Sequence, residues 1–218
     1  MALPELLING PDIATQTIVL AHGAGAPMDS PFMETFAQGL AKHDFRVVRF
    51  EFPYMHYRRQ QGGKKPPDRA PILMATWAAV INHLGCKNLI IGGKSMGGRY
   101  ASMAAEVAER DGHPVAGIIA LGYPFHPPGK PEKTRTDHLK NLKTPMLICQ
   151  GTRDTLGTRD DIMSYALPPH FQFNWLEDGD HSFKPRKKSG FTETENWHQA
   201  IQAIIKFCHD INYSRTSP

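Results

Sequence analysis

Short apolar runs rich in β-branched residues recur along the chain, and longer stretches with helical spacing separate them. Continuous apolar runs of this length are typical of strands that are buried on both faces of a parallel sheet. The runs cover residues 17–21, 45–50, 88–92, 117–121, 146–150 and 171–176.

The stretches between these runs predict helices. Ser30-Pro31 combines a favourable N-cap with proline at the first helical position, and Phe32, Phe36 and Leu40 follow at helical spacing. Further helices are predicted over residues 69–84, 96–111 and 195–211. This alternation predicts an α/β fold with a mostly parallel sheet of about six or seven strands and helices on both faces.

Composition adds size and location to this picture. The 218 residues, 40% hydrophobic and 21% charged, suit a single domain over residues 1–218. The N-terminus lacks the basic start of a signal peptide, and the longest mostly apolar window, 72–81, is about half of a membrane span. Cys86, Cys149 and Cys208 lack zinc or redox spacing and suit free thiols. We therefore expect a cytoplasmic protein without a membrane partner.

The formal net charge is +4, which is mild for a nucleic-acid-binding protein, and we expect no nucleic-acid partner. Two basic clusters nevertheless follow predicted strands. They either line the mouth of a site at the edge of the sheet or are solvated loops. The clusters are Arg58, Arg59, Lys64, Lys65 and Arg69, and Lys184, Arg186, Lys187 and Lys188.

The string Gly93-Lys94-Ser95-Met96-Gly97 fits parts of two unrelated motifs. A phosphate-binding P-loop needs a glycine five positions before its Gly-Lys-Ser, and that position is Asn88. The G-x-S-x-G elbow needs a strand before it, small flanking residues and a helix after it, and this sequence has all of these. The elbow is therefore the better interpretation, with Ser95 as a nucleophile.

An acid and a base follow this serine in the order that the elbow requires, Ser, then Asp or Glu, then His. Asp154 lies in the loop after the run 146–150, and His181 lies in the loop after the run 171–176. Both loops leave the edge of the sheet from which Ser95 emerges. We therefore predict a triad of Ser95, Asp154 and His181.

Other aspartates compete for these roles. Asp160 and Asp161 follow Thr158 and resemble carboxylates in the first turn of a helix. Asp178 and Asp180 could pair with His181 but are interpreted as solvated loop residues. Asp154 is the preferred acid.

The loop His22-Gly23-Ala24-Gly25-Ala26-Pro27 follows the first predicted strand. Its glycines let backbone N–H groups approach a substrate carbonyl oxygen. We predict an oxyanion hole made by the N–H groups of Ala24 and Met96, and a supporting role for His22.

Together, H-G-A-G-A-P, G-K-S-M-G-G, G-T-R-D and D-G-D-H-S-F make residues 17–210 resemble an α/β-hydrolase of the small, cap-less dienelactone-hydrolase-like branch. The resemblance implies that the run 17–21 is the third strand of that fold, with the N-terminal hairpin of larger members missing or reduced to residues 5–9. Dienelactone hydrolases proper carry a cysteine nucleophile, whereas position 95 is serine, so a lactone is not the expected substrate.

We accordingly expect a serine hydrolase that cleaves carboxylic esters or thioesters of small to medium acyl groups without metal or cofactor. The segment 122–145 is too short for a lid, which argues against a true lipase. Arg58, Arg59 and Lys94 are candidates for substrate binding. The alternative is a non-catalytic interaction module on a hydrolase fold that binds an acidic partner. The sequence leaves the oligomeric state open.

Overall fold

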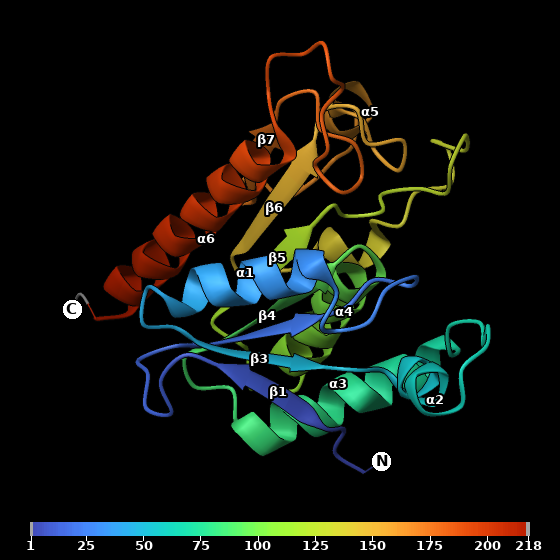
Figure 1. The fold of residues 1–218 in the computed structure, drawn as a ribbon. Helices are drawn as coiled ribbons and strands as arrows, with labels where there is room; N and C mark the ends of the chain where they lie inside the picture. Colours follow the sequence, from blue (N-terminus) through green and yellow to red (C-terminus); the bar gives the residue numbers. More distant parts are fainter. Residues whose placement is uncertain (1, 217–218) are drawn as a thin grey trace.

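The computed structural model describes residues 2–216, which form a seven-stranded sheet (Figure 1). The strands are β1 (Leu6–Asn9), β2 (Thr17–Ala21), β3 (Arg46–Phe50), β4 (Leu89–Lys94), β5 (Gly117–Leu121), β6 (Met146–Gly151) and β7 (Gln172–Leu176). Their order in the sheet is β1-β3-β2-β4-β5-β6-β7, and β2 to β7 pair in parallel. All of the predicted strands form, and the predicted fold class is confirmed.

The N-terminal strand β1 pairs antiparallel with β3, with Leu6 opposite Phe50 and Asn9 opposite Val47. Its position within residues 5–9 agrees with the reduced N-terminal element that the resemblance implied. β1 covers the edge of β3 and leaves the parallel part of the sheet to carry the loops of the site.

The helices are α1 (Pro31–Ala41), α2 (Pro53–Gln61), α3 (Ala70–Leu84), α4 (Met96–Arg110), α5 (Arg159–Met163) and α6 (Glu193–Thr216), with a 3-10 helix η1 (Asp137–Leu139). The helices predicted from periodicity are therefore confirmed, α6 with a longer extent. Ser30 is the N-cap of α1 and Pro31 its first residue, but the Ser30 side chain makes no capping hydrogen bond.

Helix α2 was not predicted from the sequence. Only Tyr54 and Met55 of this helix are buried, so it lacks the repeating apolar positions that reveal an amphipathic helix. Pro53 occupies the first turn, and Arg58 and Arg59 lie in the last turn, where the helix dipole favours positive charge. The first basic cluster therefore begins inside a helix, with Arg58 and Arg59 in its last turn.

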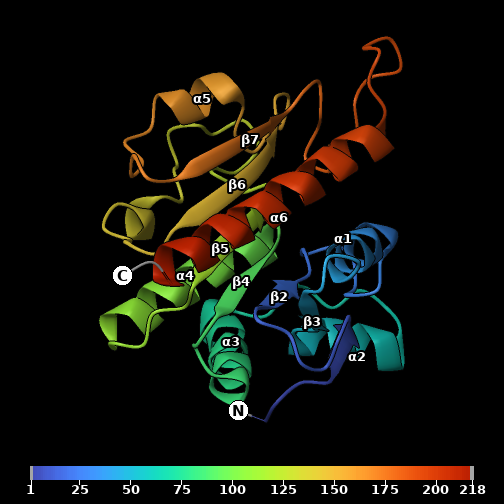
Figure 2. The same cartoon turned by 90° about the vertical axis from the view of Figure 1, so that its left-hand side faces the viewer.

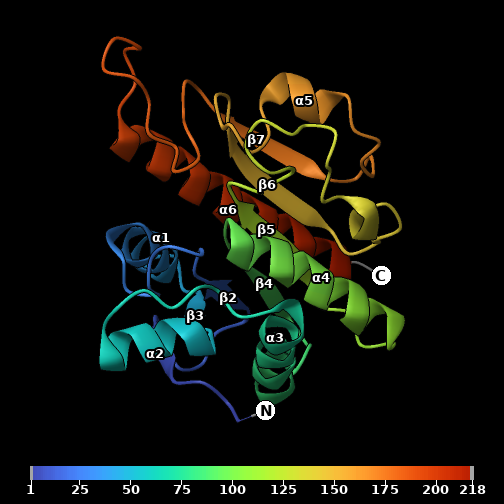
Figure 3. The same ribbon diagram turned by 90° about the vertical axis from the view of Figure 1, so that its right-hand side faces the viewer.

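Helices cover both faces of the sheet (Figures 2 and 3), with α1 and α6 on one face and α3 and α4 on the other. The strand residues alternate between these two cores. In β2, Ile18 and Leu20 pack with α1 and α6, whereas Val19 and Ala21 pack with α3 and α4. Both faces are buried, which explains why the strands read as continuous apolar runs.

The carboxyl ends of β2 to β7 lie along one edge of the sheet, since these strands are parallel. Over the described residues, the connection between β5 and β6 contains one short helix, η1, and no cap domain. No helix within residues 2–216 combines the length and apolarity needed to cross a bilayer.

Candidate active site

Ser95 sits at the turn between β4 and α4 with φ 52° and ψ −116°. Positive φ is costly for a residue with a side chain, and such strain is found at nucleophile elbows. The turn also leaves no room for side chains at its glycines. A Cβ at Gly93 would lie 2.2 Å from the Ala21 carbonyl oxygen, and one at Gly97 would lie 2.4 Å from the same oxygen. The turn thus places Ser95 at the N-terminal start of α4.

The structure brings Ser95, His181 and Asp154 together in one chain of hydrogen bonds. His181 Nε2 lies 2.8 Å from Ser95 Oγ, and His181 Nδ1 lies 2.7 Å from Asp154 Oδ2. A carboxylate on Nδ1 holds that nitrogen as the proton donor and leaves Nε2 free to accept the serine proton. The arrangement can therefore activate a hydroxyl for attack on an acyl group.

Asp154 is fully buried, and its carboxylate is held from several sides. Oδ2 accepts from Gln150 Nε2 at 2.9 Å as well as from His181, and Oδ1 accepts from the Leu156 N–H at 2.9 Å. Gln150 is itself fixed, since its Nε2 also reaches the Gly157 carbonyl at 3.1 Å. These bonds fix the carboxylate in the orientation that meets the imidazole.

The competing aspartates have other partners. Arg186 lies beside Asp178 and lowers the pKa of that carboxyl to about 2. Asp180 accepts from the N–H groups of Ser182 and Lys184 within its own loop. None of these contacts involves His181.

The aspartates after Thr158 lie at the start of α5, as expected. Thr158 and Asp161 form a reciprocal capping box, and Asp160 lies in the same first turn. Both carboxylates therefore belong to the helix start.

The two N–H groups predicted for the oxyanion hole are free. Neither the N–H of Ala24 nor that of Met96 donates to a backbone oxygen in the part of the chain that the structure describes. The Tyr54 hydroxyl donates to the carbonyl oxygens of Ala24 and Gly23, at 3.0 and 3.3 Å, and so fixes the loop that carries one of them. Tyr54 was not predicted, because it lies in α2, whose helical nature the sequence did not show.

His22 supports this loop, as we expected. Its Nε2 accepts from the Phe52 N–H at 3.1 Å, which leaves Nδ1 as the donor to the Gly23 carbonyl at 2.7 Å. Burial lowers the pKa of His22, which keeps the ring neutral. Both ring nitrogens are used, so His22 has none left to act as a base.

A groove of about 340 Å³ opens at Ser95. The oxyanion loop, the start of α1 and the loop after β7 line it. Its side chains include Phe32 and Met33, and also Lys94, His181 and Ser182. A small acyl group fits beside the serine in a groove of this kind.

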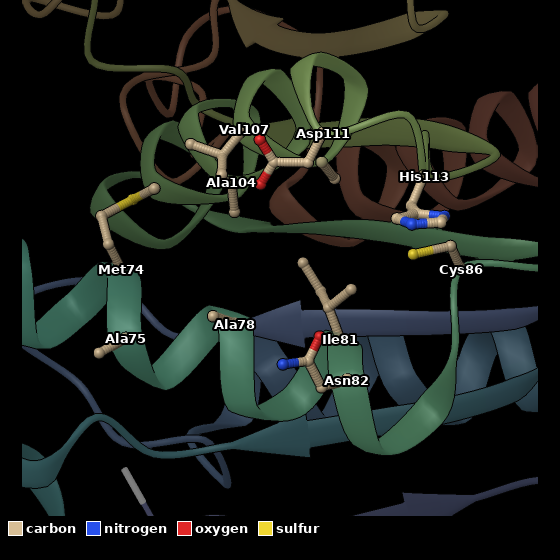
Figure 4. A pocket seen from close by; sticks show the side chains of 11 residues that line it. Met74, Ala75, Ala78, Ile81, Asn82, Cys86, Ala104, Val107, Asp111 and His113 are labelled. Atoms are coloured by element: carbon tan, nitrogen blue, oxygen red, sulfur yellow. The ribbon is translucent and has the colours of Figure 1, made fainter.

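A larger cavity of about 430 Å³ lies elsewhere, between α3 and α4 (Figure 4). Met74, Ile81 and Val107 line it, with Cys86 and His113 at one end. None of the triad residues borders it. Within the described residues, no cluster of three His, Cys, Asp or Glu side chains could hold a metal ion.

Lys94 points into the protein beside the triad. Its ammonium group donates to the carbonyl oxygen of His181 and lies 5.5 Å from the ring centre of Phe32 and 5.9 Å from that of Phe183. Burial lowers the pKa of Lys94 to about 8, although the charges of Asp154 and Asp180 oppose this shift. The contact fixes the backbone of the loop that presents His181, while the side chain still borders the groove.

This buried ammonium predicts a pH-dependent stability. The pKa of Lys94 is about 8 in the fold against 10.5 in the unfolded chain, so between these values the unfolded chain binds a proton that the folded chain does not. Stability contributed at this site therefore rises with pH from about 8 to 10.5, by up to about 3 kcal/mol. The free energies of unfolding in urea of the wild type and Lys94→Met should differ by an amount that grows across this pH window. Lys87→Met, at an exposed lysine, is the control variant. A difference between the wild type and Lys94→Met that stays the same across this window would contradict the prediction.

Arg58 and Arg59, predicted to bind substrate, do not border the groove at Ser95. Arg59 binds Glu51 at 2.6 Å and Asp29 at 2.8 Å, and Arg58 Nε donates to the Lys65 carbonyl oxygen at 2.6 Å. Arg59 thus fixes the segment after the oxyanion loop, a role that sequence spacing did not reveal. Their contribution to substrate binding stays a prediction.

Comparison with protein families gives a match over residues 14–209 to the family described as an alpha/beta hydrolase domain. This match covers most of the chain and includes every residue of the geometry above.

Solved structures resemble the fold at low sequence identity. An alpha-beta serine hydrolase homologue from Coxiella burnetii is 17% identical, with a TM-score of 0.67 over 93% of this chain and 90% of that chain. Est1E from Butyrivibrio proteoclasticus, solved with ferulic acid, is 14% identical, with a TM-score of 0.67 over 93% and 94%. A dienelactone hydrolase from Anabaena variabilis is 19% identical, with a TM-score of 0.64 over 92% and 90%.

Proposed function

Since the chain belongs to the α/β-hydrolase family, we propose that it is a serine hydrolase that cleaves carboxylic esters or thioesters through Ser95, His181 and Asp154. The observation that carries the proposal is the continuous path from Ser95 Oγ to His181 Nε2 and from His181 Nδ1 to Asp154, at 2.8 and 2.7 Å. Both distances are those of hydrogen bonds before any substrate binds.

In this mechanism His181 Nε2 takes the proton of Ser95 as its Oγ attacks the acyl carbon. The carbonyl oxygen becomes an oxyanion, which the free N–H groups of Ala24 and Met96 stabilise. His181 then donates the proton to the departing alcohol or thiol, and an acyl ester remains on Ser95. Water, deprotonated by His181, releases the acid and restores the serine.

The groove favours small acyl groups. It holds about 340 Å³, and over the described residues no cap domain covers it. We infer a single catalytic domain that acts on small-molecule substrates and needs no metal or cofactor, because the mechanism uses only side chains and backbone groups.

The alternative, a non-catalytic interaction module, has no use for a strained serine. Ser95 at φ 52° costs free energy, and Gly93 and Gly97 leave the room that this turn needs beside β2. Backbone strain of this kind is retained where a function uses it. The geometry therefore favours catalysis over a binding surface alone.

A labelling and hydrolysis experiment tests the proposal. The purified protein should react with a fluorophosphonate probe and hydrolyse p-nitrophenyl esters, with kcat/KM highest for short acyl chains. Acyl thioesters of the same chain lengths would decide between ester and thioester. Absence of both labelling and hydrolysis across the panel would support the interaction module.

A further inference from the structure

Two arginines near Ser95 have no acceptor for their guanidinium groups. Arg99 lies in the first turns of α4, and Arg135 lies in the loop between β5 and η1; both are partly buried. Within residues 2–216 neither guanidinium forms an ion pair or a hydrogen bond, and Arg99 Nε is fully buried. Arg99 has only the ring of Tyr100, at 5.3 Å, as a cation–π partner there. Buried charges are normally paired, so this pair requires an explanation.

The positive charges of the two arginines act on each other and on His138. Burial lowers the pKa of Arg135, and the neighbouring charge of Arg99 lowers it further. His138 lies in the same cluster, where burial and then the Arg99 charge lower its pKa to about 4, so its ring is neutral. The ring contacts Ser102 Oγ at 2.8 Å and supplies no negative charge.

The backbone around Arg135 is fixed before any ligand binds. The Arg135 N–H donates to the Phe125 carbonyl at 2.7 Å, and the Arg135 carbonyl accepts from the Tyr123 hydroxyl at 3.0 Å. Tyr123 is fully buried, and η1, directly after this loop, packs against α4. The two arginines are therefore held near each other in spite of their repulsion.

The pair belongs to elements that start at the same edge of the sheet as the reacting serine. Arg99 follows Ser95 by one helical turn, about 6 Å along the axis, and side chains on a helix lean back toward its N-terminus. The loop that carries Arg135 leaves β5, the neighbour of β4, at the same edge of the sheet. The oxyanion loop leaves β2, the other neighbour of β4. The loop that carries Arg135 thus leaves the sheet on the β5 side of Ser95, whereas the oxyanion loop leaves it on the β2 side.

We propose that Arg99 and Arg135 bind an oxyanion, a carboxylate or a phosphate group, that the substrate carries beyond its acyl bond. Two guanidinium groups can hold such a group with several parallel N–H···O bonds and remove the repulsion between them. The role as a substrate subsite rests on the proposed hydrolase function, whereas anion binding itself does not.

A kinetic comparison tests the substrate subsite. p-Nitrophenyl butyrate is neutral, mono-p-nitrophenyl glutarate carries a carboxylate, and the p-nitrophenyl ester of 4-phosphonobutyrate carries a phosphate-like group. We expect Arg99→Gln and Arg135→Gln each to lower kcat/KM for the preferred anionic ester about 10- to 100-fold. The neutral ester should change less than about threefold by the same reasoning. Lys133→Gln removes an exposed charge from the same loop and should affect neither.

A binding measurement tests the anion site without turnover. Glutarate and inorganic phosphate should each be titrated against the wild type and the two arginine variants by thermal unfolding, since a ligand of the fold raises its Tm. We expect the anion to raise the wild-type Tm and to leave the variants unchanged. Without anion, the variants should unfold at the wild-type temperature or up to about 4 °C higher, because one of two repelling charges is gone.

The two measurements separate the proposals. Anion binding that depends on both arginines, in a protein that hydrolyses no ester, would contradict the hydrolase function and leave the anion site standing. The anion site would be overturned if both arginine variants hydrolysed neutral and anionic esters at the same rates as Lys133→Gln and bound the anions as the wild type does. A lower Tm in both variants with anion binding retained would assign the arginines to structure alone.

Discussion

Ser95→Ala should abolish labelling by a fluorophosphonate probe and lower ester hydrolysis by about 10⁴-fold or more. The probe forms a bond to the serine oxygen, which this substitution removes, and His181 then has no hydroxyl to activate. The loss should appear in kcat, because the groove that binds the acyl group keeps its shape. Single-turnover rates and gel fluorescence measure the two effects.

Ser182→Ala is the matched control, since Ser182 borders the same groove but, within the part of the chain that the structure describes, its hydroxyl forms no hydrogen bond with His181 or Asp154. It should retain labelling and a rate within about threefold of the wild type, a change of under 1 kcal/mol. If Ser95→Ala kept labelling while Ser182→Ala lost it, the nucleophile would be Ser182. The unfolding temperature of Ser95→Ala should equal or exceed that of the wild type, because the strained turn loses no tertiary contact except that with His181.

Strands and triad geometry followed from local signals in the sequence. Each parallel strand is a continuous apolar run because both of its faces are buried, and the residues directly after it must lie at one edge of the sheet. Ser95, Asp154 and His181 all follow strands in this way. Their convergence could therefore be predicted without a structure, although their catalytic roles remain proposals.

Features that depend on tertiary packing could not be predicted in this way. Lys94 could have faced solvent or the site, and only the folded structure shows that it lies beside Phe32 and Phe183 and donates to the His181 carbonyl oxygen. Arg99 and Arg135 carry no shared motif, since one belongs to a helix and the other to an irregular loop. Their proximity depends on how the loop after β5 folds back, for which the sequence has no periodic signal.

The buried carboxylate of Asp154 leads to the second large effect. Asp154→Asn should lower kcat by about 10⁴-fold while leaving the protein folded. An amide at this position can donate to His181 Nδ1, which favours the tautomer with its proton on Nε2, so the ring can no longer accept the proton of Ser95. The Leu156 N–H can still donate to the amide oxygen and hold the new side chain in place. Gln150 Nε2 loses its acceptor on this side chain but keeps the Gly157 carbonyl oxygen.

The pH dependence and a control distinguish this role from a structural one. Asp160→Asn changes an aspartate of the first turn of α5, outside the hydrogen-bond chain, and should keep the rate within about threefold, which is under 1 kcal/mol. The kcat of Asp154→Asn should stay low at every pH at which the variant remains folded, because no pH restores the tautomer that accepts the Ser95 proton. If Asp160→Asn or Asp161→Asn lost the activity instead, with Asp154→Asn unaffected, the acid would lie in α5.

Loss of folding in Asp154→Asn, measured by circular dichroism, would mean that the carboxylate is required first for stability. The kcat of the fraction that stays folded at low temperature would then decide the catalytic role. A wild-type kcat in that folded fraction would contradict the assignment.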